Sequence, residues 1–300
     1  MITSTDPHIG IHAKTGIRIR SRYLPRRNRG RELSVNAFHV MSRFVKEVPF
    51  MDDVEKEGLR KLIWKMSAFL GVDVLTYCVM GNHFHVLIEV PERAKWLERF
   101  AGDAGEEKLL RHLGTFYSRA FMMGLRTELN QDRERKDERR AQQRLEEFRV
   151  RFCDLSVWMT EVKERFSKWL NKRRGRKGTL WMGRFRSKHI EGDNARLNVA
   201  AYIDLNPVRA EMVSDPKDYR WCGYAEALAG EERSQRGLCH VLRLRCWMTK
   251  GAEELSTKVR YRRVLFGQGQ IRFDWRGQVT RAGFSAEQVA EVFCNSIERN

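Results

Sequence analysis

Long apolar runs are missing from this sequence. No stretch approaches the roughly 18 apolar residues that a helix needs to span a bilayer. The N-terminal residues are polar and include Pro7, so we expect no signal peptide and a cytoplasmic protein. The six cysteines are scattered without a C-x-x-C pair, which disfavours a zinc site or a disulfide framework and predicts ordinary thiols. The chain also shows no internal repeat.

Acidic residues are too few to balance the basic ones. The chain has 57 Lys and Arg residues but only 39 Asp and Glu residues, which gives a net charge of +18 and a pI near 10.0. Such an excess predicts a polyanionic partner, because each phosphate contact releases a counterion. The charge alone also fits ribosomal and membrane-surface proteins. With 42% hydrophobic residues, the chain has enough apolar side chains for a real core.

The pattern of residues divides the chain into three regions. Residues 1–36 contain seven arginines between Arg18 and Arg31 and read as a basic N-terminal arm. Residues 37–228 form a central domain with a helical insertion at about 92–153. Residues 229–300 form a basic C-terminal region to which we assign no role.

Hydrophobic periodicity and turn residues predict the elements of the central domain. Strands are expected at 37–44 and 187–190, and a β-hairpin at 72–90 with its turn at Gly81-Asn82. Helices are expected from Asp53 to about Gly71, over 131–149, from a cap at Asp154 to about 170, over 193–206 and over 285–293. The helix over 193–206 is expected to be capped by Asp193 and stopped by Pro207, and the last helix to begin with a capping box at Ser285. This order predicts an α+β fold, in which helices cover an antiparallel sheet.

His83-Phe84-His85 lies on the second strand of the predicted hairpin. Alternate strand residues point to the same face, so both imidazoles emerge together and Phe84 points towards the core. Two neutral imidazoles form a bidentate metal clamp, although such a pair is also found as a structural or incidental feature. Two ligands are too few for catalysis, so a third is expected elsewhere.

The helix at 193–206 has two different stripes. Residues four apart are neighbours on a helix, so Asn194, Asn198, Tyr202 and Asn206 share one stripe, whereas an apolar stripe lies beside it. If the polar stripe faces the hairpin, Asn206 completes a His-His-Asn site beside the phenol of Tyr202. The alternative is that Tyr202 packs in the core and Asn206 caps the helix before Pro207.

A phenol with a pKa of about 10 is a weak nucleophile unless its target is polarised. A divalent ion on a phosphate withdraws charge and aligns the group for in-line attack. Imidazole and oxygen ligands suit Mn²⁺ and tolerate Mg²⁺, so we expect one of these ions as cofactor.

Five blocks of the sequence resemble a known family in the family's own order. Residues 77–88 (YCVMGNHFHVLI) resemble the Y-C-x-M-P-N-H-x-H-x-L segment of single-tyrosine His-hydrophobic-His transposases. Residues 202–213 (YIDLNPVRAEMV) resemble the Y-I-x-L-N-P-V-R-A-x-x-V signature of REP-associated tyrosine transposases. Residues 178–187 (GTLWMGRFRS), 38–43 (FHVMSR) and 215–224 (DPKDYRWCGY) are similar to three further family segments.

The resemblance implies a ferredoxin-like fold and a divalent metal. It also implies cleavage and rejoining of single-stranded DNA at palindromic hairpins through a 5′-phosphotyrosine. By position His83 and His85 match the metal histidines, Tyr202 the nucleophile and Asn206 the additional ligand. Related insertion-sequence transposases carry Gln at that last position, and Gly81 stands where the family usually has Pro. The regions 92–153 and 229–300 fall outside the resemblance.

The stretch 172–188 contains no acid and is the predicted DNA-binding surface. Its basic residues are Lys172, Arg173, Arg174, Arg176, Lys177, Arg184, Arg186 and Lys188. Trp181 and Phe185 lie among them and either stack on bases, worth about 1–3 kcal/mol each, or anchor the loop to the core. Arg43 and Arg209 either reach phosphates near the metal or form structural ion pairs. The arm at 18–31 is predicted to hold the hairpin duplex.

Two other functions fit the same sequence. One is a module of this fold that binds DNA or RNA hairpins without cutting them, for which the full set of His83, His85, Tyr202 and Asn206 would have no chemical purpose. The other is a replication initiator or relaxase, which usually carries more metal histidines or a second tyrosine. The sequence leaves open the target DNA and whether the protein is a monomer or a homodimer.

Overall fold

The fold was described from a computed structural model, which defines residues 9–11, 18–20, 35–243, 252–276 and 278–294. The chain divides into two compact units. The insertion unit comprises residues 69–72 and 91–160 with the described part of 1–36. The sheet unit comprises residues 37–68, 73–90 and 161–300. Most of the predicted N-terminal arm lies outside the described residues.

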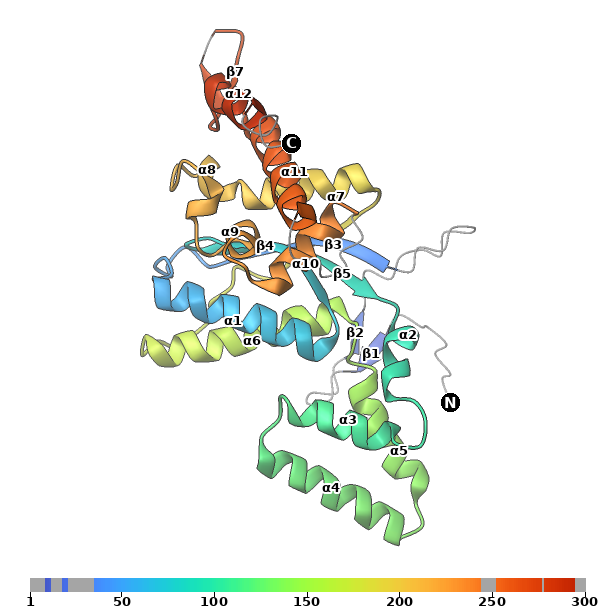
Figure 1. Ribbon diagram of the computed structural model, residues 1–300. Coiled ribbons are helices and arrows are strands. Elements are labelled where there is room, and N and C mark those ends of the chain that lie inside the picture. Colours follow the sequence, from blue (N-terminus) through green and yellow to red (C-terminus); the bar gives the residue numbers. More distant parts are fainter. Residues whose placement is uncertain (1–8, 12–17, 21–34, 244–251, 277, 295–300) are drawn as a thin grey trace. The chain divides into compact units, whose positions relative to one another are not determined.

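A four-stranded antiparallel sheet organises the sheet unit (Figure 1). Its strands are β3 (Val35–Arg43), β4 (Asp73–Val79), β5 (His83–Pro91) and β6 (Arg186–Ile190). They lie in the order β4-β5-β3-β6, which is the order of a ferredoxin-like sheet. The α+β class, the strands and the hairpin turn predicted from the sequence are confirmed. β6 pairs with β3 so that Lys188 lies opposite His39.

Helices α1 (Asp53–Leu70) and α6 (Leu155–Arg173) lie side by side on one face of the sheet (Figure 1). A capping box starts α1, because the Glu55 amide donates to the Asp52 carboxylate at 2.8 Å and the Asp52 amide donates to Glu55 at 2.9 Å. The predicted cap of α6 is also confirmed, since the Val157 amide donates to the Asp154 carboxylate at 2.9 Å. No helix in the described part of the chain is long and apolar enough to cross a membrane.

The opposite face of the sheet is covered by shorter helices (Figure 1). They are α7 (Asp193–Asp204), α8 (Asn206–Arg209), α9 (Gly223–Leu228) and α10 (Glu232–Val241), with a 3₁₀ turn, η2 (Pro216–Asp218), before α9. Glycine allows two of them to approach β4 closely. A Cβ at Gly237 would overlap the carbonyl oxygen of Leu75, and one at Gly223 would overlap the Thr76 hydroxyl.

The C-terminal region packs into the core of the sheet unit. It contains α11 (Ala252–Gly269), β7 (Arg272–Phe273), β8 (Val279–Arg281) and α12 (Ala286–Cys294). Tyr261 and Leu265 are fully buried together with Ile203 of α7. The predicted capping box of α12 is confirmed, because Ser285 and Gln288 exchange hydrogen bonds between amides and side chains.

The insertion unit is helical in its long segment, as predicted. It contains two short paired strands, β1 (Ile9–Ile11) and β2 (Arg18–Arg20), and the helices α2 (Arg93–Leu97), η1 (Glu98–Phe100), α3 (Gly105–Gly114), α4 (Arg119–Glu134) and α5 (Glu138–Arg149). The prediction of one helix over 131–149 is wrong. The backbone turns at Lys136, where φ is +58°, and Asp137 caps α5 through the amide of Arg140 at 3.0 Å.

One expectation at each end of α7 and one for the cysteines need correction. Gly192, not Asp193, is the N-cap of α7, because the Asp193 carboxylate is engaged by Arg196 and Arg243. Pro207 does not stop the chain's helical course but lies in the first turn of α8, where its missing N–H costs nothing. Cys239 forms a disulfide instead of the expected thiol.

Asp204 is a fully buried carboxylate that joins distant elements. Its oxygens accept hydrogen bonds from the Thr76 hydroxyl of β4 at 2.7 Å and from the Tyr261 hydroxyl of α11 at 2.6 Å. The amide of Tyr224 on α9 approaches at 3.4 Å. Burial outweighs these bonds and raises the pKa of Asp204 to about 7.

Replacing Asp204 with Asn is expected to flatten the pH dependence of stability. Between pH 3.8 and about 7 the folded chain keeps a proton at Asp204 that the unfolded chain has released. The free energy of unfolding therefore falls as the pH rises through this window, by about 4 kcal/mol in total. Urea unfolding at several pH values measures this slope. An unchanged slope in Asp204→Asn, or the same flattening in Asp103→Asn on the surface, would contradict the assignment.

Candidate active site

His83 and His85 lie side by side on β5, with ring centroids 5.2 Å apart. The side chain between them, Phe84, is fully buried and contacts Trp181 on the other side of the sheet, with ring centroids 5.7 Å apart. The predicted alternation along this strand is therefore confirmed. The two imidazoles face the side of the sheet that α7 covers, because the ring of His85 meets the ring of Tyr202.

Hydrogen bonds at Nδ1 orient both imidazoles. Nδ1 of His83 lies 2.8 Å from Oδ1 of Asn82, and because a carbonyl oxygen only accepts, this nitrogen carries the proton. Nδ1 of His85 lies 2.9 Å from Nε2 of His39 on β3. The Nε2 lone pair of His83 is then left for a ligand. The same holds for His85 when its Nδ1 donates to His39. Outer partners of this kind fix the tautomer of metal-binding histidines.

The three histidines are neutral at physiological pH. Burial lowers the pKa of His85 to about 3, and repulsion from the adjacent imidazoles of His39 and His83 would add to this effect when they are protonated. Burial also lowers the pKa of His83, with a smaller effect from the positive charge of Arg43. The same cause lowers the pKa of His39, helped by Lys188. Neutral imidazoles have the free lone pairs that metal ligation requires.

Tyr202 of α7 reaches these histidines from the adjacent layer. Its ring centroid lies 5.7 Å from that of His85 and 5.9 Å from that of His39. The side chain is 42% exposed, so the phenol is accessible from solvent. The guanidinium of Arg209 lies 5.0 Å from the ring centroid, and Arg209 also donates to the Tyr202 carbonyl oxygen at 3.4 Å. The structure thus brings together the histidine pair and the tyrosine that the sequence analysis selected.

Asn206 is engaged with its own helix. Its amide nitrogen donates to the carbonyl oxygens of Tyr202 at 2.9 Å and Ile203 at 3.2 Å, which is the helix-end role considered as an alternative. Within the described residues, no three His, Cys, Asp or Glu side chains are grouped to hold a metal. Asn206 as a third protein ligand beside His83 and His85 stays a prediction.

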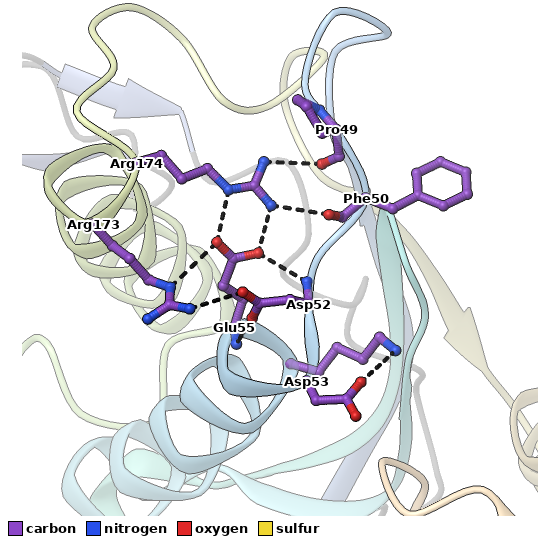
Figure 2. Close-up of polar contacts among 8 residues, drawn as sticks. Pro49, Phe50, Asp52, Asp53, Glu55, Arg173 and Arg174 are labelled. Carbon is purple, nitrogen blue, oxygen red and sulfur yellow. Dashed lines mark hydrogen bonds and ion pairs between the residues drawn. The ribbon is translucent and has the colours of Figure 1, made fainter.

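The predicted DNA-binding residues fall into two groups. Arg173 and Arg174 form ion pairs with the start of α1: Arg173 donates to Asp52 at 2.8 Å, and Arg174 binds the buried Glu55 (Figure 2). Arg176 donates to Asn171 at 3.0 Å. These three make ion pairs or hydrogen bonds within the fold, although Arg173 is itself exposed. The other exposed members are Arg43, Lys172, Lys177, Arg184, Arg186 and Lys188.

The two aromatic residues of the basic stretch differ from each other. Trp181 is only 8% exposed, and its indole nitrogen donates to the Ser167 hydroxyl at 2.8 Å and to the Lys163 carbonyl oxygen at 3.1 Å. The side chain therefore anchors the loop to α6 and the sheet, which is the alternative to stacking that the sequence analysis left open. Phe185 is half-buried.

His39 was missed by the sequence analysis, although it lies in a block that carries the family resemblance. On the sequence it is one polar residue in a strand, and its partner His85 is 46 positions away. A ferredoxin-like sheet places its first and third strands next to each other. A histidine on the first strand was therefore the available signal.

Comparisons with known proteins add little to this geometry. No family model matches the sequence, and no curated protein matches it. Among solved structures, a REP-associated tyrosine transposase bound to a REP hairpin is similar, with a TM-score of 0.40 and 15% sequence identity. The likeness covers 65% of this chain and 79% of that chain. At this level it assigns no function to the residues described above.

Proposed function

We propose that this chain is a metal-dependent transposase that cleaves and rejoins single-stranded DNA at palindromic hairpins, with Tyr202 as nucleophile and a 5′-phosphotyrosine intermediate. One observation carries the proposal. An exposed tyrosine on α7 meets two neutral histidines on β5, with 5.7 Å between the ring centroids of Tyr202 and His85. Neither the core nor the surface of a simple binding protein needs this combination.

The chemistry of the donor set fits Mg²⁺ or Mn²⁺. His83 and His85 would hold the ion through Nε2, and the amide oxygen of Asn206 is the proposed third protein ligand. A bound divalent ion would neutralise charge on the phosphoryl oxygens of the scissile phosphate. Asn82 and His39 orient the imidazoles from behind, at 2.8 and 2.9 Å.

Tyr202 would form a bond from its phenolic oxygen to the phosphorus while the bond from phosphorus to the 3′ oxygen breaks. The phenol releases its proton to solvent, to which it is exposed, and the departing 3′ oxygen gains one. Because the ester is exchanged and not hydrolysed, a 3′-hydroxyl can later attack the phosphotyrosine and restore a phosphodiester. The guanidinium of Arg209 lies against the phenol ring, where it could contact the phosphate of a bound strand.

Tyr202→Phe is expected to abolish covalent capture of DNA. A hairpin oligonucleotide labelled at its 3′ end and incubated with Mn²⁺ should give a labelled protein band after denaturing electrophoresis. Tyr117→Phe, outside the site, should give the same band as the wild-type chain. An adduct that persists in Tyr202→Phe contradicts the mechanism. Hairpin binding without an adduct in the wild type favours the binding module.

Removing the metal or one of its histidines should stop cleavage and leave DNA binding in place. His83→Ala deletes one ligand, whereas His189→Ala on β6 provides a matched control outside the histidine pair. Treatment with a chelator should stop the reaction of the wild-type chain, and added Mn²⁺ or Mg²⁺ should restore it. Cleavage that survives both the chelator and His83→Ala would rule out the metal assignment.

The exposed cations should contribute to DNA affinity and to its dependence on salt. Replacing Arg184, Arg186 and Lys188 together with Gln removes up to three phosphate contacts. The slope of log affinity against log salt for single-stranded DNA should then become shallower by about 2, since each contact contributes about 0.7. A matched triple substitution at Arg119, Arg135 and Arg139 on the insertion unit is the control. Equal slopes for the two triple variants would contradict the predicted surface.

A further inference from the structure

Phe50 is an exposed aromatic residue that packs on Gly81, two residues before His83 in the sequence. It lies in the loop between β3 and α1, and 72% of its side chain is accessible to solvent. The ring lies against Gly81, where the nearest ring atom is 3.1 Å from the position that a Cβ would occupy. A Cβ at 81 would require the ring to shift by a few tenths of an ångström. Phe50 and Gly81 are therefore in close contact.

The backbone of this loop is held from two sides. The guanidinium of Arg174 donates to the carbonyl oxygens of Pro49 at 3.1 Å and Phe50 at 3.0 Å, while it also binds the buried carboxylate of Glu55. On the other side, the amide of Met51 donates to the carbonyl oxygen of Gly81 at 2.6 Å. Figure 2 shows the ring of Phe50 pointing away from this polar network. An apolar ring is thus fixed in an outward position.

The ring of Phe50 lies close in sequence to the histidine pair, through the residue that it contacts. Gly81, which it covers, is followed by Asn82 and His83, and Asn82 holds the imidazole of His83 at 2.8 Å. The exposed Arg43 supplies positive charge near this turn, because the amide of the next residue, Phe44, donates to the Asn82 carbonyl oxygen at 2.8 Å. The carbonyl oxygen of Arg43 accepts from the amide of Met182, whose side chain is 62% exposed.

We propose that Phe50 is a stacking surface for an unpaired nucleobase, next to the phosphate that the candidate active site would bind. This inference rests on the proposed function. An unpaired base offers a flat apolar face to the ring, and its phosphates face exposed cations such as Arg43. A protein partner is less suitable, because a stable protein interface needs several hundred square ångströms of continuous contact surface on each side.

The test uses the full chain and a set of single-stranded oligonucleotides derived from a hairpin substrate. Each carries the fluorescent base 2-aminopurine at one position, and stacking on an aromatic ring quenches its emission. One position is expected to be quenched by the wild-type chain and by Phe50→Trp but not by Phe50→Leu. Phe273→Leu, a change at another exposed phenylalanine, should behave as the wild type does.

The same variants should differ in affinity. Phe50→Leu is expected to weaken binding by about 5- to 150-fold, the loss of one stacked base. An abasic residue at the quenched position should weaken the wild type similarly and have no added effect in Phe50→Leu. Wild-type affinity and an unchanged quenching profile in Phe50→Leu would overturn the inference.

The outcome also separates this inference from the proposed function. In Phe50→Leu, loss of quenching with retained adduct formation supports the stacking surface and leaves the proposed Tyr202 chemistry unaffected. An unchanged profile with normal adduct formation overturns the stacking surface and leaves Tyr202 chemistry intact. Absence of any single-stranded DNA binding by the wild-type chain would overturn both.

Discussion

The buried carboxylate of Asp204 determines how the tyrosine helix is placed. Its bonds to Thr76 and Tyr261 join α7 to the sheet below and to α11 beyond it. Residues two apart on a helix point in nearly opposite directions, so an inward Asp204 leaves Tyr202 on the outer side, where it meets His85. The geometry of the candidate active site is in this sense a consequence of one polar contact inside the core.

Positive charge in this protein serves two separate purposes. The excess of basic residues suggested a partner rich in phosphate, yet some of the most densely basic sequence is used internally. Arg174 neutralises Glu55, a carboxylate that is only 2% exposed and could not be buried without a cation. Arg184 and Arg186, a few residues further along the chain, are exposed. Net charge therefore overstates how many cations are available to a nucleic acid.

Local patterns in the sequence were sufficient for much of the fold. Alternation placed Phe84 opposite the histidines, and the four-residue spacing placed Tyr202 on an exposed stripe, because both periodicities depend only on neighbouring residues. Contacts between positions that are distant in the sequence could not be predicted from local patterns. Nothing near His39 in the sequence indicates its bond to His85, and the burial of Trp181 depends on how the basic loop folds back onto α6. The role of Asn206 could not be decided from spacing, since an amide serves equally as a ligand or a helix cap.

The close approach of the short helices to β4 has a consequence for association. β4 is an edge strand of the sheet, and exposed edges invite strand addition by other chains. Here that edge is blocked, because the backbone at Cys78 forms an antiparallel β-bridge with the backbone at Cys222, and the amide of Val79 donates to the Trp221 carbonyl oxygen at 2.9 Å. The opposite edge, β6, carries Arg186 and Lys188, whose like charges repel a second copy. The sheet is therefore protected from extension at both ends, by a covering segment at one and by charge at the other.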